Sequence, residues 1–263
     1  MQPSMTTTMR KLPEWFKVRF PNGDNYLRLK NLMRSQRLHT VCEEAACPNI
    51  GECWDRGTAT FMILGDVCTR ACSYCNVKTG RPSEVDYGEP LRVALTVRDM
   101  DLKYVVVTSV DRDDIPDGGA KQFAETIKLI REYVPGIHIE VLVPDFNGDK
   151  SSIETVMSQH PEVLNHNVEA PRRIFRKVRP RGNYDLTLQL LKRAGDIEPG
   201  STTKSGMMVG LGETKEEIFD TMEDLKSVGT DLLTIGQYLR PTRGHHPVIR
   251  FYHPEEFKEL EEK

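Results

Sequence analysis

The sequence has no cysteine after Cys75, no long apolar run and little excess charge of either sign. A helix that crosses a bilayer needs about 20 mostly apolar residues, and no such run occurs. The first segment, Met1–Arg10, is polar and rich in Thr, so it lacks the apolar core of a secretory signal. Lys and Arg number 36 and Asp and Glu number 39, and the net charge of -3 implies no general attraction to nucleic acid or to a membrane surface. These absences predict a protein of the cytoplasm, or of an organellar matrix if a transit peptide has been removed.

Short apolar runs alternate with amphipathic segments from residue 59 onward. The runs predict buried strands, and the segments between them place apolar residues at helical spacing. The expected strands are Thr60–Leu64, Tyr104–Val110, His138–Val143, Val163–Val168, Gly206–Val209 and Leu232–Leu239. Six strand–helix units with right-handed crossovers predict an α/β fold, a partial (β/α)6 barrel, with an open doubly wound sheet as the alternative. In either fold, ligands gather at the carboxyl ends of the strands.

Two helix boundaries and one domain boundary follow from local signals. Thr214 and Glu217 have the spacing of a capping box at the start of a helix. Gly195 is expected to end the helix that contains Leu188 and Leu191. Residues 1–58 show no sustained period and are interpreted as an N-terminal extension that carries cysteines. Residues 59–263 are interpreted as the barrel domain.

The first group of cysteines, Cys68, Cys72 and Cys75, has C-x3-C-x2-C spacing and follows the first expected strand. Three thiolates on one tight loop can hold three irons of a four-iron cluster and leave the fourth iron open for another ligand. A zinc site is the alternative, but it usually combines C-x2-C pairs with a fourth Cys or His. The spacing, with Tyr74 before the last cysteine, is similar to the signature of radical S-adenosylmethionine (SAM) enzymes.

The second group, Cys42, Cys47 and Cys53, has C-x4-C-x5-C spacing. These thiolates predict a second iron–sulfur cluster, again with one protein ligand fewer than four. Unrelated buried thiols are the alternative, but all six cysteines of the chain fall between Cys42 and Cys75. A disulfide framework is not expected, because such frameworks belong to small secreted domains.

Segments around both cysteine groups make the chain resemble the lipoyl synthase family of radical SAM enzymes. The resemblance extends from about Leu38 to Phe257. The segments are Leu38–Ala45, Cys47–Asn49, Glu52–Trp54, Arg70–Val77, Gly80–Pro82, Glu89–Pro90, Thr108–Asp114, Leu164–Glu169 and Gln237–Thr242. The resemblance implies two [4Fe-4S] clusters and S-adenosyl-L-methionine as cofactors, with the auxiliary cluster on the second cysteine group.

The resemblance also implies where SAM binds. Expected contacts come from Tyr74, from Thr108 and Ser109 for the methionyl amino group, from Asn167 and Glu169 for the ribose, from Arg181 and Lys204 for the carboxylate, and from Gly210 and Glu213 within Gly206–Glu213 for the adenosine. Without the cysteines, Gly206–Glu213 would predict only a strand–turn–helix junction.

The reaction that the resemblance implies is sulfur insertion at carbons 6 and 8 of an octanoyl chain on a carrier lysine, the auxiliary cluster donating the sulfur. A reduced first cluster cleaves SAM to methionine and a 5′-deoxyadenosyl radical, which removes hydrogen from the chain. No catalytic side chain is expected beyond the clusters and SAM. The implied partners are an octanoylated lipoyl carrier domain, such as a dehydrogenase E2 subunit or glycine cleavage H protein, and a ferredoxin- or flavodoxin-type reductant.

Three further patterns have competing interpretations. Asp111, Asp113 and Asp114 predict a solvated acidic loop, and His245–His246 predicts a surface turn in preference to a metal site. A basic cluster is either a solvated face or, as we favour, a docking surface for an acidic carrier. Its members are Arg172, Arg173, Arg176, Lys177, Arg179 and Arg181.

One element of the family pattern is missing. The family binds its auxiliary cluster with a further serine in an R-S-S-Y motif, and this sequence contains no such motif. The sequence therefore predicts either a truncated chain or another ligand for that iron. Other interpretations stay open: a radical SAM enzyme with another substrate, an electron carrier without catalysis, or a zinc-stabilised binding module.

Overall fold

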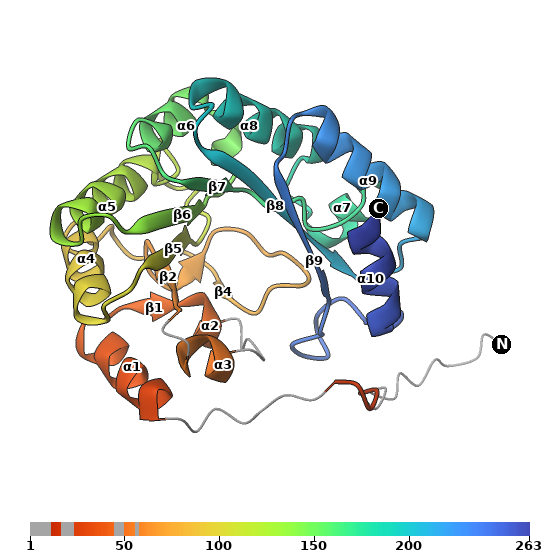
Figure 1. The fold of residues 1–263 in the computed structure, drawn as a ribbon, viewed down its shortest axis with the longest axis horizontal. Coiled ribbons are helices and arrows are strands. Elements are labelled where there is room, and N and C mark those ends of the chain that lie inside the picture. The colour runs from red at the N-terminus through yellow and green to blue at the C-terminus, as the bar shows by residue number, and fades with distance from the viewer. Residues whose placement is uncertain (1–11, 17–23, 45–49, 56–57) are drawn as a thin grey trace.

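Strands and helices alternate along most of the chain (Figure 1). The computed structural model describes residues 12–16, 24–44, 50–55 and 58–263. Its strands are β1 (His39–Thr40), β2 (Thr60–Ile63), β3 (Val67–Cys68), β4 (Lys78–Thr79), β5 (Tyr104–Ser109), β6 (His138–Leu142), β7 (Val163–Asn165), β8 (Thr202–Val209) and β9 (Leu232–Gln237). Its helices are α1 (Asp24–Ser35), α2 (Val41–Glu44), α3 (Ile50–Asp55), α4 (Glu89–Asp99), α5 (Ala120–Tyr133), α6 (Lys150–Met157), α7 (Arg172–Val178), α8 (Tyr184–Ile197), α9 (Lys215–Ser227) and α10 (Pro254–Glu262), with a 3-10 turn η1 (Phe146–Gly148).

The main sheet keeps its strands in chain order, β1-β2-β5-β6-β7-β8-β9. Strands β2 to β9 of this sheet are parallel, and β1 is antiparallel to β2. A doubly wound sheet reverses its strand order at a switch point, so that alternative is wrong. The strands instead curve into a partial barrel that is not closed, since the described edge strands β1 and β9 do not pair with each other.

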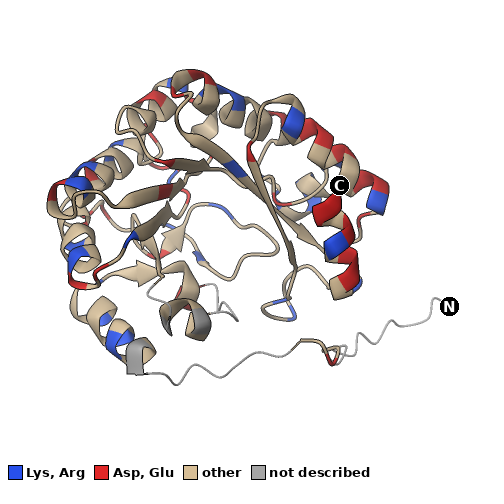
Figure 2. Ribbon diagram, in the orientation of Figure 1, with Lys and Arg blue, Asp and Glu red and all other residues tan. Residues whose placement is uncertain are grey.

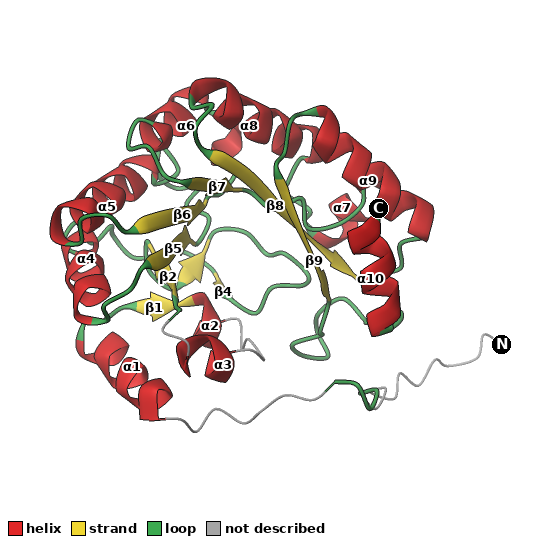
Figure 3. Cartoon of the chain, viewed as in Figure 1, coloured by secondary structure: helices red, strands yellow, loops and turns green. Residues whose placement is uncertain are grey.

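The outer face of this sheet packs against a layer of helices (Figure 3). Outward-facing residues such as Val105, Val107 and Ile139 are fully buried, and so are Phe123 and Ile127 on α5. Because successive residues of a strand alternate between faces, the residues between them point into the barrel. The inward Val106 and Leu142 are only partly buried, so the concave face offers room for ligands.

The structure confirms most of the expected elements and corrects several. The capping box of Thr214 and Glu217 begins α9. Strand β8 begins at Thr202 rather than Gly206, because Lys204 points into the barrel and hides the strand pattern. Gly195 does not end a helix, since α8 continues to Ile197. The domain boundary after residue 58 stays a prediction, because residues 56–57 lie outside the described part.

Charged residues are spread along the outer helices (Figure 2). Within the described residues, no helix has both the length and the apolar character that a bilayer crossing requires.

Candidate functional site

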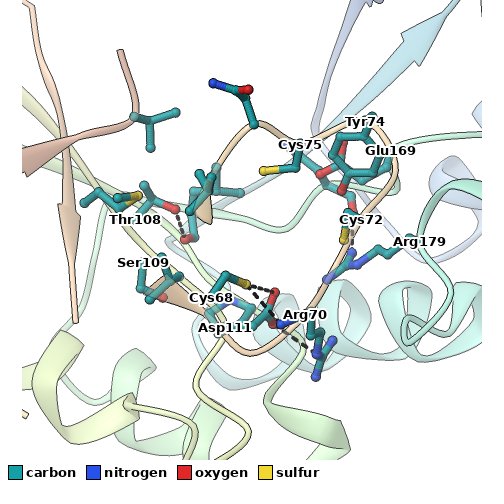
Figure 4. Close-up of a pocket in the computed structure, with 18 of the residues that line it drawn as sticks. Cys68, Arg70, Cys72, Tyr74, Cys75, Thr108, Ser109, Asp111, Glu169 and Arg179 are labelled. Atoms are coloured by element: carbon teal, nitrogen blue, oxygen red, sulfur yellow. Dashed lines mark hydrogen bonds and ion pairs between the residues drawn. The ribbon is translucent and has the colours of Figure 1, made fainter. Parts of the chain in front are cut away.

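The first cysteine loop follows β2 and runs from β3 to β4. Figure 4 shows its three cysteines at the cavity. Cys68 ends β3, and its carbonyl accepts a hydrogen bond from the Gly80 amide at 3.0 Å. The Cys75 amide donates to the Cys72 carbonyl at 3.1 Å, which forms a tight turn between these two cysteines. The loop therefore brings the three thiols to one end of the barrel, as the sequence predicts.

Arg70, between the first two cysteines, anchors this loop to carboxylates from other parts of the chain. The residue is 3% exposed, and its guanidinium donates two 2.7 Å hydrogen bonds to Asp145, one to each carboxylate oxygen. The same group donates to Asp113 at 2.7, 2.9 and 3.2 Å and to the Asn147 side-chain oxygen at 2.8 Å. Burial opposes ionisation of Asp145, but the hydrogen bonds and charge of Arg70 outweigh it and lower the pKa of Asp145 to about 2. Paired, planar contacts of this kind fix the loop in one position.

The segment after β9 also holds the cysteine loop, through hydrogen bonds from two histidines. His245 Nε2 lies 2.9 Å from the Cys75 carbonyl oxygen, and the His246 amide donates to the Ser73 carbonyl at 2.8 Å. A carbonyl only accepts, so His245 Nε2 carries a proton, while Nδ1 lies 2.8 Å from the Thr242 hydroxyl. His246 is buried, and its Nε2 lies 2.9 Å from the Leu211 carbonyl oxygen. The two histidines thus hold the cysteine loop and are not a plain surface turn.

The three cysteines border a cavity of about 530 Å³. Burial raises the pKa of the Cys72 thiol to about 12 and that of the Cys75 thiol to about 11, so metal binding has to displace protons. Among the described residues, no three Cys, His, Asp or Glu side chains converge on one position where a single ion would bind. Three cysteines that border one cavity fit a cluster, in which each thiolate binds its own iron.

Two polar atoms in the cavity wall have no hydrogen-bond partner within the described protein, although one of them, Asp111 Oδ1, lies 3.4 Å from Arg70 Nε in an ion pair. They are the Ser109 hydroxyl and the Oδ1 atom of Asp111, both buried. Asp111 Oδ2 lies 3.9 Å from the Cys68 sulfur. Buried polar groups usually pair with something, so these two acceptors fit a ligand that carries a donor such as an ammonium group. SAM has such a group, and the residues present therefore fit it. Asp111 is consequently not part of a purely solvated loop.

Glu169 and Tyr74 lie together on another side of the cavity, with Arg179 near Cys72 (Figure 4). Burial raises the pKa of Glu169, although the Arg179 charge and hydrogen bonds from Tyr74 and Asn167 oppose the rise. Glu169 also has a left-handed backbone, with φ of 66°, which is uncommon for a residue with a side chain. Strain of this kind often occurs at binding sites.

Of the SAM contacts predicted from the sequence, five lie in the cavity wall. They are Tyr74, Thr108, Ser109, Asn167 and Glu169. The other four are placed outside the wall. Arg181 is exposed and donates to the Thr69 carbonyl at 3.1 Å, and Lys204 pairs with Glu140 inside the barrel at 3.0 Å.

Gly210 and Glu213 form the turn between β8 and α9. Glu213 accepts hydrogen bonds from the Gly210 amide at 2.6 Å, the Leu211 amide at 2.9 Å and the Tyr252 hydroxyl at 2.7 Å. The strand–turn–helix interpretation of this motif is therefore correct, and its role toward SAM stays a prediction.

The second cysteine group is described in part. Cys42 lies on α2 and Cys53 on α3, and Cys47 lies outside the described residues. Val41, next to Cys42, lines the same cavity as Cys75. The Asn76 side-chain amide also donates to the Glu44 carbonyl at 3.1 Å. This bond ties the helix of Cys42 directly to the first cysteine loop.

The basic cluster around α7 is only partly exposed. Arg172 pairs with Asp185 at 2.6 Å, and Arg173 pairs with Glu217 at 2.5 Å. Arg179 is 6% exposed and lies 3.8 Å from Asp145, so including it in a surface cluster was wrong.

Sequence reasoning missed the residues that hold the site together. Arg70, Asp145 and Arg179 lie far apart in the chain but meet under the cysteine loop. The only local signal was a charged residue, Arg70, inside a metal-binding motif.

The chain matches two protein-family models. Residues 62–225 match the radical SAM superfamily, and residues 3–47 match the N-terminal domain of lipoyl synthase of the radical SAM family. The chain is 56% identical to lipoyl synthase of Rubrobacter xylanophilus over 245 residues, which cover 93% of this chain and 76% of that protein. It is 56% identical to lipoyl synthase of Shouchella clausii, with coverage of 97% and 82%, and 54% identical to that of Thermus thermophilus, with coverage of 96% and 79%.

Solved structures with low sequence identity share the fold. The FeFe-hydrogenase maturase HydG from Carboxydothermus hydrogenoformans has a TM-score of 0.61 at 14% identity, covering 89% of this chain and 62% of that one. Methylornithine synthase (PylB) has a TM-score of 0.57 at 14% identity, covering 86% and 64%. The cysteine loop at the barrel end, the fold and the near-full-length similarity agree, and the chain belongs to the lipoyl synthase family of radical SAM enzymes.

Proposed function

We propose that the protein inserts sulfur at carbons 6 and 8 of an octanoyl chain carried on a protein lysine, and that it uses two [4Fe-4S] clusters to do so. The observation that supports this most directly is that the first cysteine group and a chain neighbour of the second group border one cavity. Cys68, Cys72 and Cys75 line it, and so does Val41 beside Cys42. A substrate in this cavity would lie between a site for hydrogen removal and a site for sulfur delivery.

Different residues of the chain would bind the two clusters and SAM at this cavity. Cys68, Cys72 and Cys75 would hold the SAM cluster, and Ser109 and Asp111 would accept hydrogen bonds from the SAM ammonium group. Cys42, Cys47 and Cys53 would hold the auxiliary cluster. When bound, the clusters and SAM supply the one-electron chemistry that removes hydrogen from an unactivated carbon and provides sulfur. Apolar wall residues such as Leu142 and Met208 would keep water away from the reacting chain.

Atoms and electrons balance for each sulfur. One C–H bond breaks and one C–S bond forms, and the hydrogen leaves in 5′-deoxyadenosine while SAM also yields methionine. A low-potential reductant, of the ferredoxin or flavodoxin type, supplies one electron for the cleavage of SAM. The auxiliary cluster, when held by Cys42, Cys47 and Cys53, would supply the sulfur as sulfide, and its iron would accept the electron released as the C–S bond forms.

The proposed substrate carrier is an octanoylated lipoyl carrier domain, such as an E2 subunit or an H protein. Arg176 and Lys177 are exposed on α7 next to the cysteine loop, whose Ser73 amide donates to the Val178 carbonyl at 2.8 Å. An acidic carrier would be attracted to this basic face and so would deliver its acyl chain near the cavity. Neither nucleic acid nor membrane is part of the proposal. Six cysteines used as cluster ligands also suit a reducing compartment such as the cytoplasm.

Cysteine substitutions test the two-cluster proposal. The chain is purified and reconstituted without oxygen, reduced, and given SAM and an octanoyl-lysine peptide. We expect about eight irons per chain for the unchanged protein, with both 5′-deoxyadenosine and a sulfur-containing peptide as products.

One variant of each cysteine group should separate the roles of the two clusters. Cys42→Ala/Cys53→Ala should hold about four irons and still form 5′-deoxyadenosine, but it should give no sulfur product. Cys72→Ala should fail to cleave SAM. Sulfur insertion by Cys42→Ala/Cys53→Ala would contradict the assignment of the auxiliary cluster, and iron-free protein after reconstitution would contradict both clusters.

A further inference from the structure

Four polar side chains form a connected row inside the barrel, away from the cysteine loop. They come from four neighbouring strands: Tyr104 on β5, Glu140 on β6, Asn165 on β7 and Lys204 on β8. Lys204 Nζ lies 3.0 and 3.1 Å from the two Glu140 oxygens. The Asn165 amide donates to Glu140 at 3.0 Å, and the Tyr104 hydroxyl also donates to Glu140. We call this set the polar row.

The polar row faces the same interior as the cavity. Residues two or four positions apart on a strand share a face. Glu140 lies two residues before Leu142, Lys204 four before Met208 and Tyr104 four before Thr108, and the three later residues all line the cavity. At about 3.3 Å per residue, Glu140 is therefore roughly 7 Å below Leu142 along β6.

Placing an apolar group against the polar row costs free energy, because it removes water from polar atoms. Glu140 is 3% exposed and already satisfied by three partners, so it cannot move to make room without losing a buried ion pair. The Oδ1 atom of Asn165 is buried without a partner in the described protein. A hydrocarbon end pressed against this surface would keep water from that atom and from the ion pair. The barrel interior thus has the apolar Leu142 and Met208 near the cysteines and the polar row farther in.

The proposed reaction, on which this inference rests, needs such a boundary. Carbons 6 and 8 of a saturated chain carry no polar group by which a site can recognise them. Their position has to be set by the two ends of the chain: the carbonyl end, held by the carrier lysine, and the methyl end, held by the wall it meets. We propose that the polar row is the stop for the methyl end of the acyl chain, and that it fixes both the accepted chain length and the carbons that receive sulfur. Lys204 is accordingly a specificity-determining residue and not a ligand of the SAM carboxylate.

The experiment replaces the polar row's ion pair by apolar residues of similar size, Glu140→Leu/Lys204→Met. Replacing both partners of a buried ion pair by hydrophobic groups is often neutral or stabilising. Asn165 and Tyr104 also lose their acceptor in this variant, so its folding is verified by urea denaturation before the assays. The matched control is Lys192→Met/Asp196→Leu, which removes an exposed ion pair on α8. All three reconstituted proteins are given octanoyl- and decanoyl-lysine peptides. The measurements are peptide affinity without reductant, sulfur product by mass spectrometry, and the KM for SAM.

The unchanged protein and the control should prefer octanoyl peptide in both affinity and product. In Glu140→Leu/Lys204→Met, the ratio of decanoyl to octanoyl affinity should rise roughly tenfold or more, a usual effect of extra methylene groups in an apolar pocket. Sulfur should then appear at more than one pair of carbons, while the KM for SAM should stay unchanged. An unaltered chain-length ratio in this variant, or a raised KM for SAM with the same acyl preference, would overturn the proposal. If the unchanged protein inserts no sulfur into the octanoyl peptide, the proposed function fails instead, and the affinity ratio still tests the polar row.

Discussion

Arg70 joins the cysteine loop to two carboxylates from other parts of the chain, Asp113 and Asp145. Substitution Arg70→Met removes the nearest cation of both carboxylates and leaves them only the more distant Arg179 and Arg181, at 3.8 and 3.7 Å, while Asp145 is almost fully buried. Removing one partner of a buried ion pair commonly costs about 3–5 kcal/mol. We therefore expect the free energy of unfolding to fall by about that amount in urea denaturation of the iron-free chain, and iron uptake to fall with it.

The control for Arg70 is Arg98→Met. Arg98 pairs with Asp99 on the surface of α4, and both side chains are about half exposed. Exposed pairs contribute at most about 1 kcal/mol, so this variant should unfold nearly as the unchanged protein does. Equal losses in the two variants would show that the buried contacts of Arg70 do not anchor the loop.

His166 gives the stability of the protein a pH dependence. It is buried, with Nδ1 2.8 Å from the Val143 carbonyl oxygen and Nε2 3.2 Å from the Thr187 hydroxyl. Burial first, and then the positive charge of Arg179, lower the pKa of His166 to about 4. The unfolded chain, whose histidine has a pKa of about 6.5, binds the proton more readily, so stability falls as pH drops from about 6.5 toward 4.

The contribution of His166 can be isolated by His166→Gln, which does not titrate. Between pH 7 and pH 5 the unchanged chain should lose about 2 kcal/mol more than this variant. Urea denaturation at several pH values measures the difference. Parallel pH profiles for the two chains would rule out a buried neutral histidine at this position.

The turn between β8 and α9 depends on a glycine. Gly210 has φ of 95°, and a Cβ there would lie 2.2 Å from the Gln237 side-chain nitrogen and 2.6 Å from the Arg250 carbonyl oxygen. Gly229, after α9, has φ of 80° and no atom within 4 Å of such a Cβ. Substituting alanine at either position adds left-handed strain of about 1–2 kcal/mol. Only Gly210→Ala adds crowding, which should cost about 1–3 kcal/mol more.

Thermal or urea unfolding of Gly210→Ala and Gly229→Ala measures this difference. Because both glycines have a left-handed backbone, the difference in stability between the two variants reports crowding alone. A Gly210→Ala variant as stable as Gly229→Ala would mean that the segment after β9 does not pack closely on this turn.

Elements with a strong local signal could be predicted from the sequence. The capping box at Thr214 and the apolar strands β5 and β6 depend on residues that are neighbours in the chain. Strand β8 was placed too late because Lys204 occupies an inward position that an apolar residue usually fills. Its partner Glu140 is on another strand, so only the folded sheet shows why a charge is tolerated there.

At the scale of the molecule, the cysteine motif could be predicted from the sequence, but the residues that hold the cysteine loop in place could not. The spacing of Cys68, Cys72 and Cys75 is a local pattern that the chemistry of a cluster requires. The contact of Arg70 with Asp145, or of His245 with Cys75, joins residues far apart in the sequence. Such contacts depend on how the barrel brings loops to one end, and no local period indicates them.

The positive charge of α7, next to the cysteine loop, predicts how strongly the protein binds its carrier domain. Arg172 and Arg173 are neutralised by Asp185 and Glu217, so the proposed attraction depends mainly on the exposed Arg176 and Lys177. Arg176→Glu/Lys177→Glu should raise the KM for an octanoylated carrier domain about tenfold or more at low salt. The effect should shrink as added salt shortens the screening length to about 3 Å at 1 M. Activity on a short octanoyl-lysine peptide should change little. Lys128→Glu/Lys192→Glu, at exposed positions on α5 and α8, makes the same change in net charge and serves as the control. An unchanged KM for the carrier at low salt would place the docking surface elsewhere on the molecule.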